Sequence, residues 1–160
     1  MIKKSYEKYV LPKLLDCCCS TKPITYQRKK VVPNAHGNIL EIGIGSGLNL
    51  PYYEKSKINK FYGLDPSGEL CDMAEKTASE NDIDINLIVN GAEEIKLPQD
   101  TIDTVVITYT LCTIPNPIDA LKEVKRVMKT DAKILFCEHG IAPDKNVILS
   151  LIHISEPTRP

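Results

Sequence analysis

The sequence predicts an α/β fold in which helices cover both faces of an open, mostly parallel, doubly wound sheet. Two observations lead to this expectation. From residue 38 onward, short apolar runs alternate with stretches of helical periodicity, and a glycine-rich segment overlaps the end of the first run. Strands that alternate with helices pair in parallel through right-handed crossovers. The length of 160 residues, of which 42% are hydrophobic, suits one packed domain.

Five strands and two crossover helices are expected after the N-terminal region. The apolar runs place strands at residues 38–44, 58–65, 85–91, 102–110 and 132–140. Helical periodicity places helices at residues 67–82 and 116–130. The apolar residues that share one face of the second helix are Ile118, Leu121, Val124 and Met128.

Residues 1–37 are expected to form a basic helical cap, with short helices at Ser5–Leu15 and Ile24–Val32. Residues 1–32 carry eight Lys/Arg and only two Asp/Glu. This charge is either a solvated helical face or a contact with an anionic membrane surface. The net charge of the whole chain is −1, which argues against nucleic acid as an obligate partner.

Composition also bears on the compartment. No apolar stretch approaches the length that spans a bilayer, and the N-terminus lacks the apolar core of a secretory signal. The six cysteines form no Cys-x-x-Cys pair, which is typical of reduced thiols. We therefore expect a cytoplasmic protein, with peripheral membrane contact as an open alternative. No metal site is expected at Cys17–Cys19, because adjacent helical residues point in different directions.

The glycine-rich segment begins within the first expected strand. Gly43, Gly45 and Gly47 alternate behind Glu41, whereas the dinucleotide pattern G-x-G-x-x-G requires a third glycine where Leu48 stands. A pyrophosphate binds to bare backbone N–H groups, and a carboxylate at the lip of the turn would repel it. The same carboxylate would suit an ammonium or sulfonium centre. The turn itself would let a ligand approach the backbone closely.

Asp65 ends the second expected strand. Its carboxylate can accept hydrogen bonds from both hydroxyls of a ribose, although a lone Asp in this place can also cap the following helix. Its distance in sequence from the glycine turn favours the ribose. The expected ligand is therefore a nucleoside with a cationic tail. Ligands of such sheets bind beyond the carboxyl ends of the strands.

The sequence resembles the class I S-adenosylmethionine-dependent methyltransferases across residues 38–140. The resemblance rests on four motifs in the order of that family: ILEIGIGSGLN, YGLDPS, NGAEEIKLPQDTIDTVV and ALKEVKRVMKTDAKILFCEHG. Within the superfamily the chain is similar to small bacterial enzymes that resemble the microsomal alkyl-thiol methyltransferases and, more distantly, phospholipid and quinone methyltransferases. The resemblance implies a Rossmann-like sheet, S-adenosylmethionine as the cofactor and a small-molecule methyl acceptor.

The resemblance also assigns roles to residues. Glu41 and the turn from Gly43 to Gly47 would hold the methionine end of the cofactor, and Asp65 the ribose. Pro66 would lie near the adenine. The family often has Asp where this chain has Gly91, so the contact to the adenine amine passes to Glu93 or to backbone. The full set of candidate cofactor-binding residues is Glu41, Gly43, Gly45, Gly47, Asp65, Pro66, Gly91, Ala92, Glu93, Thr108 and Thr110.

Methyl transfer from a sulfonium is an in-line displacement that needs no metal and depends mainly on positioning. A thiol or hydroxyl acceptor also benefits from a base. His139 and Tyr109 are the catalytic candidates, because each lies at the carboxyl end of an expected strand. The alternatives are that His139 only hydrogen-bonds the backbone and that Tyr109 is an ordinary strand residue.

The C-terminal segment 149–160 departs from the pattern. LSLIHISEPTRP resembles a translated sequencing adaptor, so we expect it to be a non-native tail. Residues 38–148 would then form an incomplete, C-terminally truncated domain with five of the seven strands of the class I methyltransferase fold. Two other hypotheses remain open at this point: a nicotinamide-dependent oxidoreductase on a similar sheet, and a fragment that binds the cofactor without chemistry.

Overall fold

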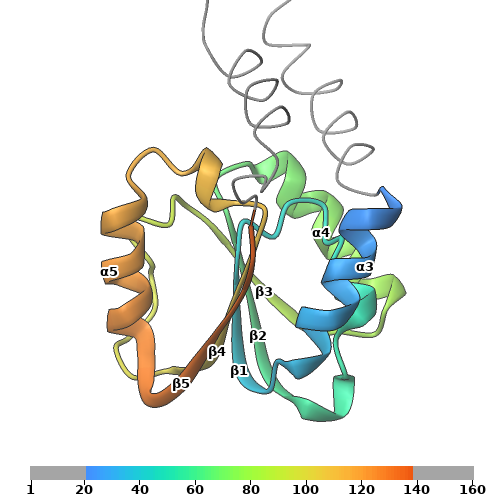
Figure 1. The fold of residues 1–160 in the computed structure, drawn as a ribbon, viewed down its shortest axis with the longest axis horizontal. Coiled ribbons are helices and arrows are strands. Elements are labelled where there is room, and N and C mark those ends of the chain that lie inside the picture. The colour runs from blue at the N-terminus through green and yellow to red at the C-terminus, as the bar shows by residue number, and fades with distance from the viewer. Residues whose placement is uncertain (1–20, 139–160) are drawn as a thin grey trace, which may run out of the picture.

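A five-stranded parallel sheet forms the centre of the computed structural model, which describes residues 21–138 (Figure 1). The strands are β1 (Gly37–Ile42), β2 (Ile58–Asp65), β3 (Ile85–Val89), β4 (Ile102–Thr108) and β5 (Met128–Cys137). They lie in the order β3-β2-β1-β4-β5, and every neighbouring pair is parallel. The chain therefore builds outward from β1 in both directions, which places a topological switch point between β1 and β4. This confirms the predicted doubly wound fold.

Helices cover both faces of the sheet. Figure 1 shows α3 (Lys22–Val31) and α4 (Gly68–Glu80) on one face and α5 (Pro117–Val127) on the other. The short 3₁₀ helices are η1 (Val32–Asn34), η2 (Leu50–Tyr52), η3 (Lys55–Lys57) and η4 (Leu111–Thr113). None of the helices within residues 21–138 is both long and apolar enough to cross a bilayer.

Two apolar clusters hold these layers together. One cluster, on the side of α4, includes Ile39, Phe61 and Ala74. The other, on the side of α5, includes Leu40 and Val124. Ile39 and Leu40 point to opposite faces because successive side chains of a strand alternate. Both faces of β1 are therefore buried, as expected for a central parallel strand.

The predicted apolar face of α5 was right for Val124, which is buried, and wrong for Ile118 and Leu121. The helix buries Ala120, Val124 and Val127, whereas Ile118 and Leu121 are 67% and 43% exposed. Its predicted extension to residue 130 also fails, because Met128 is already extended and pairs with Ile102 as the first residue of β5. Strand pairing prevails over helical periodicity here.

Other boundaries moved less. β4 ends at Thr108 rather than at residue 110, because the next residue has a φ of 55° and leaves the strand. The expected helix 24–32 corresponds to α3. The expected helix Ser5–Leu15, the candidate His139 and the segment 149–160 lie outside the described residues. The proposed domain limits stay a prediction.

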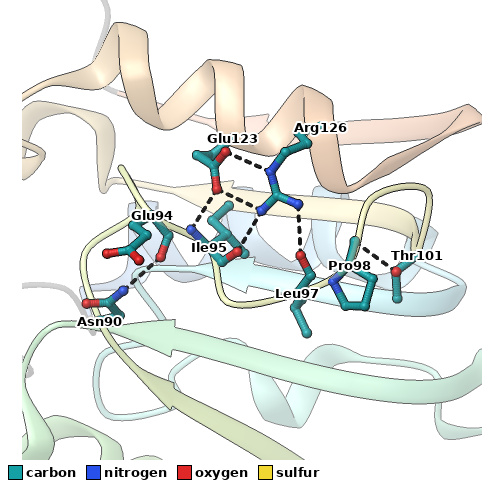
Figure 2. A network of polar contacts seen from close by, with 8 residues as sticks. All are labelled: Asn90, Glu94, Ile95, Leu97, Pro98, Thr101, Glu123 and Arg126. Atoms are coloured by element: carbon teal, nitrogen blue, oxygen red, sulfur yellow. Dashed lines mark hydrogen bonds and ion pairs between the residues drawn. The ribbon is translucent and has the colours of Figure 1, made fainter.

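A polar network ties the loop between β3 and β4 to α5 (Figure 2). The Glu123 carboxylate accepts a hydrogen bond from the Ile95 N–H at 2.9 Å. Arg126 donates to the carbonyl oxygens of Ile95 at 2.7 Å and Leu97 at 2.9 Å, and it pairs with Glu123 at 2.7 Å. This network fixes the loop that follows residues 91–93.

Candidate functional site

A cavity of about 450 Å³ opens at the carboxyl ends of the central strands. Its walls come from the ends of β1 and β2, the start of α4, the loop after β3 and the segment after β4. The predicted residues that line it are Gly43, Asp65, Pro66, Gly91, Ala92, Glu93 and Thr110. Hence residues that are far apart in the sequence meet where the strand-end rule expects a ligand.

Two other hollows of about 470 Å³ lie near the amino ends of strands, one beside Ile58 and one beside Asp103. Parallel sheets bind their ligands beyond the carboxyl ends of the strands, which is the other end from these hollows. Each hollow contains an aspartate that is paired with a lysine, Asp82 with Lys55 at 3.1 Å in the first and Asp103 with Lys129 at 2.7 Å in the second. Among the described residues, no group of three or more His, Cys, Asp or Glu side chains is arranged to hold a metal ion.

Asp65 ends β2 and lies in the wall of the cavity with only 6% exposure. Its Oδ2 accepts the Gly45 N–H at 3.0 Å and its Oδ1 accepts the Ser67 N–H at 2.9 Å. Burial raises the pKa of this carboxyl, and the two N–H donors counteract the shift. Each oxygen can still accept a further hydrogen bond. The helix-capping alternative fails, because Ser67 is the residue that caps α4.

The glycines of the turn differ in what surrounds them. Gly47 has a φ of 86°, and a Cβ there would lie 2.7 Å from the side chain of Leu50. Gly45 has a φ of 57°, and a Cβ there would meet nothing within 4 Å. Gly47 is therefore required by the packing of the protein itself. Gly45 instead borders open space and donates its N–H to Asp65, which leaves room for a ligand beside the backbone.

Glu41 does not occupy the lip of the turn, contrary to the sequence prediction. Its side chain is 2% exposed and lies beneath the turn, away from the cavity wall. The carboxylate accepts hydrogen bonds from Asn49 Nδ2 at 2.8 Å and from the Tyr53 hydroxyl at 2.7 Å. Burial raises the pKa of Glu41 from 4.5 to about 7, against the opposing effects of these two donors and of Arg28.

Arg28 is a functional candidate that the sequence analysis missed. Its guanidinium, 6% exposed at the residue level, donates from Nη1 to Asn49 Oδ1 at 2.6 Å and to Thr108 Oγ1 at 3.0 Å. Asn49 Nδ2 also donates to Thr108 Oγ1, at 3.0 Å. Thr108 thus belongs to this buried network rather than to the cavity wall. Nothing in the sequence separates Arg28 from the exposed Lys29 and Lys30 that follow it.

Tyr109 turns the chain out of β4 in a left-handed conformation, with a φ of 55°. Its hydroxyl lies 3.2 Å from Cys137 Sγ, and the Arg28 guanidinium lies 5.5 Å from its ring centre. Burial and the neighbouring thiol raise the pKa of Tyr109 to about 12. The phenol is therefore protonated at neutral pH, so it can donate a hydrogen bond but is a poor base. The role predicted for His139 stays a prediction.

A profile described as "Methyltransferase domain" matches residues 40–136. The chain belongs to this methyltransferase family. The assignment and the five-stranded parallel sheet confirm the predicted class I fold, and they agree with S-adenosylmethionine as the expected cofactor. The residues fit a nucleoside ligand, because the buried Asp65, Gly43 of the turn and the apolar Pro66 and Leu70 line one cavity.

Curated relatives agree with this assignment. The chain is 29% identical over 123 residues to thiol S-methyltransferase TMT1B of Rattus norvegicus, covering 75% of this chain and 50% of the relative. It is 30% identical over 117 residues to phosphatidylethanolamine N-methyltransferase of Cereibacter sphaeroides, covering 72% and 56%. The chain thus spans about half the length of these relatives.

A solved structure shows the same fold. The YcgJ protein of Bacillus subtilis superposes with a TM-score of 0.65 at 24% identity, covering 79% of this chain and 54% of that one.

The two glycines allow a matched prediction. Gly45→Ala places a methyl group in open space and costs about 1–2 kcal/mol for its left-handed backbone. Gly47→Ala costs more stability, because the methyl group must also displace Leu50. We expect Gly45→Ala to weaken S-adenosylhomocysteine binding at least tenfold, as measured by calorimetry, with unfolding in urea as the stability readout. Unchanged affinity in Gly45→Ala would mean that the ligand does not approach this turn.

Glu41 predicts a dependence of stability on pH. Because its folded pKa of about 7 exceeds the ordinary value of 4.5, the folded state holds the proton more tightly, and Glu41 costs stability as pH rises through this window. The full cost is about 3 kcal/mol. Glu41→Gln removes the titration, so its unfolding free energy relative to wild type should increase between pH 5 and pH 8. Urea unfolding of both proteins at four pH values tests this. If the unfolding free energies of wild type and Glu41→Gln changed in parallel with pH, the raised pKa of Glu41 would be contradicted.

Proposed function

We propose that the protein is an S-adenosylmethionine-dependent methyltransferase that acts on a small molecule, namely a thiol, a lipid or a quinone-like compound. The observation that carries the proposal is the cavity wall in which Asp65 is held by Gly45 and Ser67 within a matched methyltransferase domain. The range of acceptors follows relatives whose names specify thiols, phosphatidylethanolamine and quinones. The chain is 32% identical to the last of these, UbiE of Rickettsia massiliae, over 119 residues, covering 67% of this chain and 46% of the relative.

The donor side of the site would be built from β1 and β2. Asp65 would accept the ribose hydroxyls, with its orientation already fixed by two backbone N–H groups. Ala92, Glu93 and Pro66 would border the base. Gly45 would allow the amino-acid end to lie against the turn. When bound, the cofactor would supply a methyl group carried on a sulfonium, and transfer of that methyl group leaves a neutral thioether. The protein then contributes mainly by aligning donor and acceptor.

The acceptor side would be built from the segment after β4. Thr113, Ile114 and Pro115 give this wall of the cavity a mostly apolar character. An apolar wall suits a lipophilic acceptor better than a charged one. Tyr109 does not line the cavity, and its protonated phenol contacts Cys137, so the predicted catalytic role of Tyr109 has no support from this geometry. His139 remains the proposed base where the acceptor carries a thiol or hydroxyl proton.

Ligand-dependent unfolding tests the proposal. S-adenosylhomocysteine should raise the thermal midpoint of the 160-residue chain, because a ligand that binds only the folded state stabilises it. NADH should leave the midpoint unchanged, and a shift with NADH alone would favour the oxidoreductase hypothesis instead.

Variants of two aspartates localise the binding. Asp65→Ala should weaken S-adenosylhomocysteine binding at least tenfold, whereas Asp72→Ala on the exposed surface of α4 should not. Equal affinity of both variants, measured by calorimetry, would remove Asp65 from the site. Binding without methyl transfer to any thiol, lipid or quinone tested would indicate a domain that retains the cofactor without chemistry.

We further propose that the protein is cytoplasmic and meets anionic membranes through its basic N-terminal region. The described part of that region supports the idea: Lys29 and Lys30 are exposed at the end of α3, and the ring of Tyr26, 60% exposed, lies 4.1 Å from Lys30 Nζ. Lysines beside exposed tyrosines suit a headgroup surface.

Vesicle sedimentation tests the membrane contact. The chain should sediment with phosphatidylserine vesicles at low salt and dissociate as salt screens the charges. Phosphatidylcholine vesicles serve as the control and should not retain it. No sedimentation with anionic vesicles at low salt would leave the basic region as a solvated helical face.

A further inference from the structure

Glu138 follows β5 and reaches across to the segment after β4. Its Oε1 accepts the N–H of Thr110 at 2.8 Å and the N–H of Leu111 at 3.2 Å. These two donors begin the short helix η4, where backbone N–H groups have no partners within the helix. Hydrogen bonds to a carboxylate are stronger than those to a neutral acceptor. One side chain thus holds the start of η4 against β5, although Glu138 itself does not line the cavity.

The segment that Glu138 holds forms one wall of the cavity. Thr110, Thr113, Ile114 and Pro115 all line it. Thr110 also lies directly over the glycine turn, because a Cβ added at Gly43 would collide with the Thr110 side chain. The wall is therefore closely fitted to the turn, and a small displacement of this segment would change the shape of the cavity.

The same segment starts with an unfavourable backbone conformation. Tyr109 has a φ of 55°, and the left-handed region is disfavoured for a residue with a Cβ. Such a conformation persists only where surrounding contacts hold it. The contacts that hold it include the hydrogen bond from the Tyr109 N–H to the Cys137 carbonyl at 2.8 Å and, one residue later, the hydrogen bond from the Thr110 N–H to Glu138.

We propose that Glu138 is a positioning residue that affects donor binding through the segment after β4, the acceptor-side wall that meets the glycine turn where Thr110 lies over Gly43. It holds residues 109–115 in the arrangement that closes the cavity over Gly43, so that the ligand does not have to order this wall as it binds. This inference rests on the proposed function, because it names the donor as the ligand of the cavity. If the wall were ordered in only some of the molecules, only those molecules could bind the ligand. The apparent affinity would then fall in proportion to the fraction of molecules with an ordered wall.

Three variants test the role of the carboxylate through S-adenosylhomocysteine affinity measured by calorimetry. Glu138→Ala should weaken binding about tenfold, corresponding to about 1.4 kcal/mol. Glu138→Gln keeps an oxygen acceptor and should stay within about threefold of wild type. Asp103→Ala is the matched control. Asp103 likewise accepts a backbone N–H, that of Asn38 at 2.8 Å, but it lies at the amino ends of the strands, away from the cavity. This control variant should lower the thermal midpoint without changing affinity.

A rescue variant separates positioning from general stability. Glycine adopts a φ of 55° without the penalty that tyrosine has, so Tyr109→Gly should reduce the need for Glu138. Glu138→Ala should then weaken binding by less than about threefold in the Tyr109→Gly background, against about tenfold in wild type. Equal losses in both backgrounds would overturn the proposed link to Tyr109.

Hydrogen–deuterium exchange of residues 109–116 provides a readout that does not depend on the ligand. Glu138→Ala should increase exchange at Thr110 and Leu111, and unchanged exchange would overturn the proposal whether or not the wild type binds S-adenosylhomocysteine. If exchange rises but the wild type does not bind S-adenosylhomocysteine, the proposed function fails, and with it the assignment of Glu138 to a donor site. If Glu138→Ala weakened S-adenosylhomocysteine binding no more than Asp103→Ala does, the positioning role of Glu138 would also be overturned.

Discussion

The buried amide of Asn49 holds the site region together, because it joins two groups of opposite charge that do not touch each other. Its oxygen accepts from the Arg28 guanidinium, and its nitrogen donates to the Glu41 carboxylate and to Thr108. Only one orientation of the amide satisfies both neighbours. Asn49 is fully buried, and a buried charge without a partner is strongly destabilising. The network therefore fixes α3, β1, β4 and the glycine turn relative to one another.

This arrangement gives the two sides of the cavity different origins. The donor side depends on β1, β2 and the turn, which are anchored from below by Glu41 and Asn49. The acceptor side depends on the segment after β4, which Glu138 holds from β5. The two sides meet where Thr110 lies over Gly43. A family that keeps one donor while it varies its acceptors benefits from such a division, because loops can change without altering the scaffold.

Much of this architecture followed from the sequence, for identifiable reasons. Parallel strands align their carboxyl ends, so the meeting of Gly43, Asp65 and Ala92 at one cavity could be expected once the strands were located. Buried strands have a distinct apolar pattern, and β1, β2 and β4 were found close to their predicted limits. The limits of α5 were less predictable, because Val127 and Met128 suit a helix or a strand equally in isolation.

The roles of polar side chains were harder to predict, because these depend on tertiary contacts. Glu41 looks the same in sequence whether its carboxylate faces a ligand or a tyrosine hydroxyl. Arg28 has the local context of a surface cation, and only the depth at which α3 packs makes it an interior one. Tyr109 carries no signal of its left-handed backbone, since tyrosine is an unusual residue for that conformation.

The contact between Gly43 and Thr110 has a consequence for how such chains can diverge. Two positions that are 67 residues apart share one small volume, so a side chain at residue 43 would need a smaller or displaced residue at position 110. A side chain at residue 43 would require the neighbouring wall to withdraw, which would enlarge the cavity on its acceptor side. The volume of the cavity is thereby linked to the absence of a side chain at residue 43. In this protein one glycine shapes the turn and also sets how closely the segment after β4 can approach it.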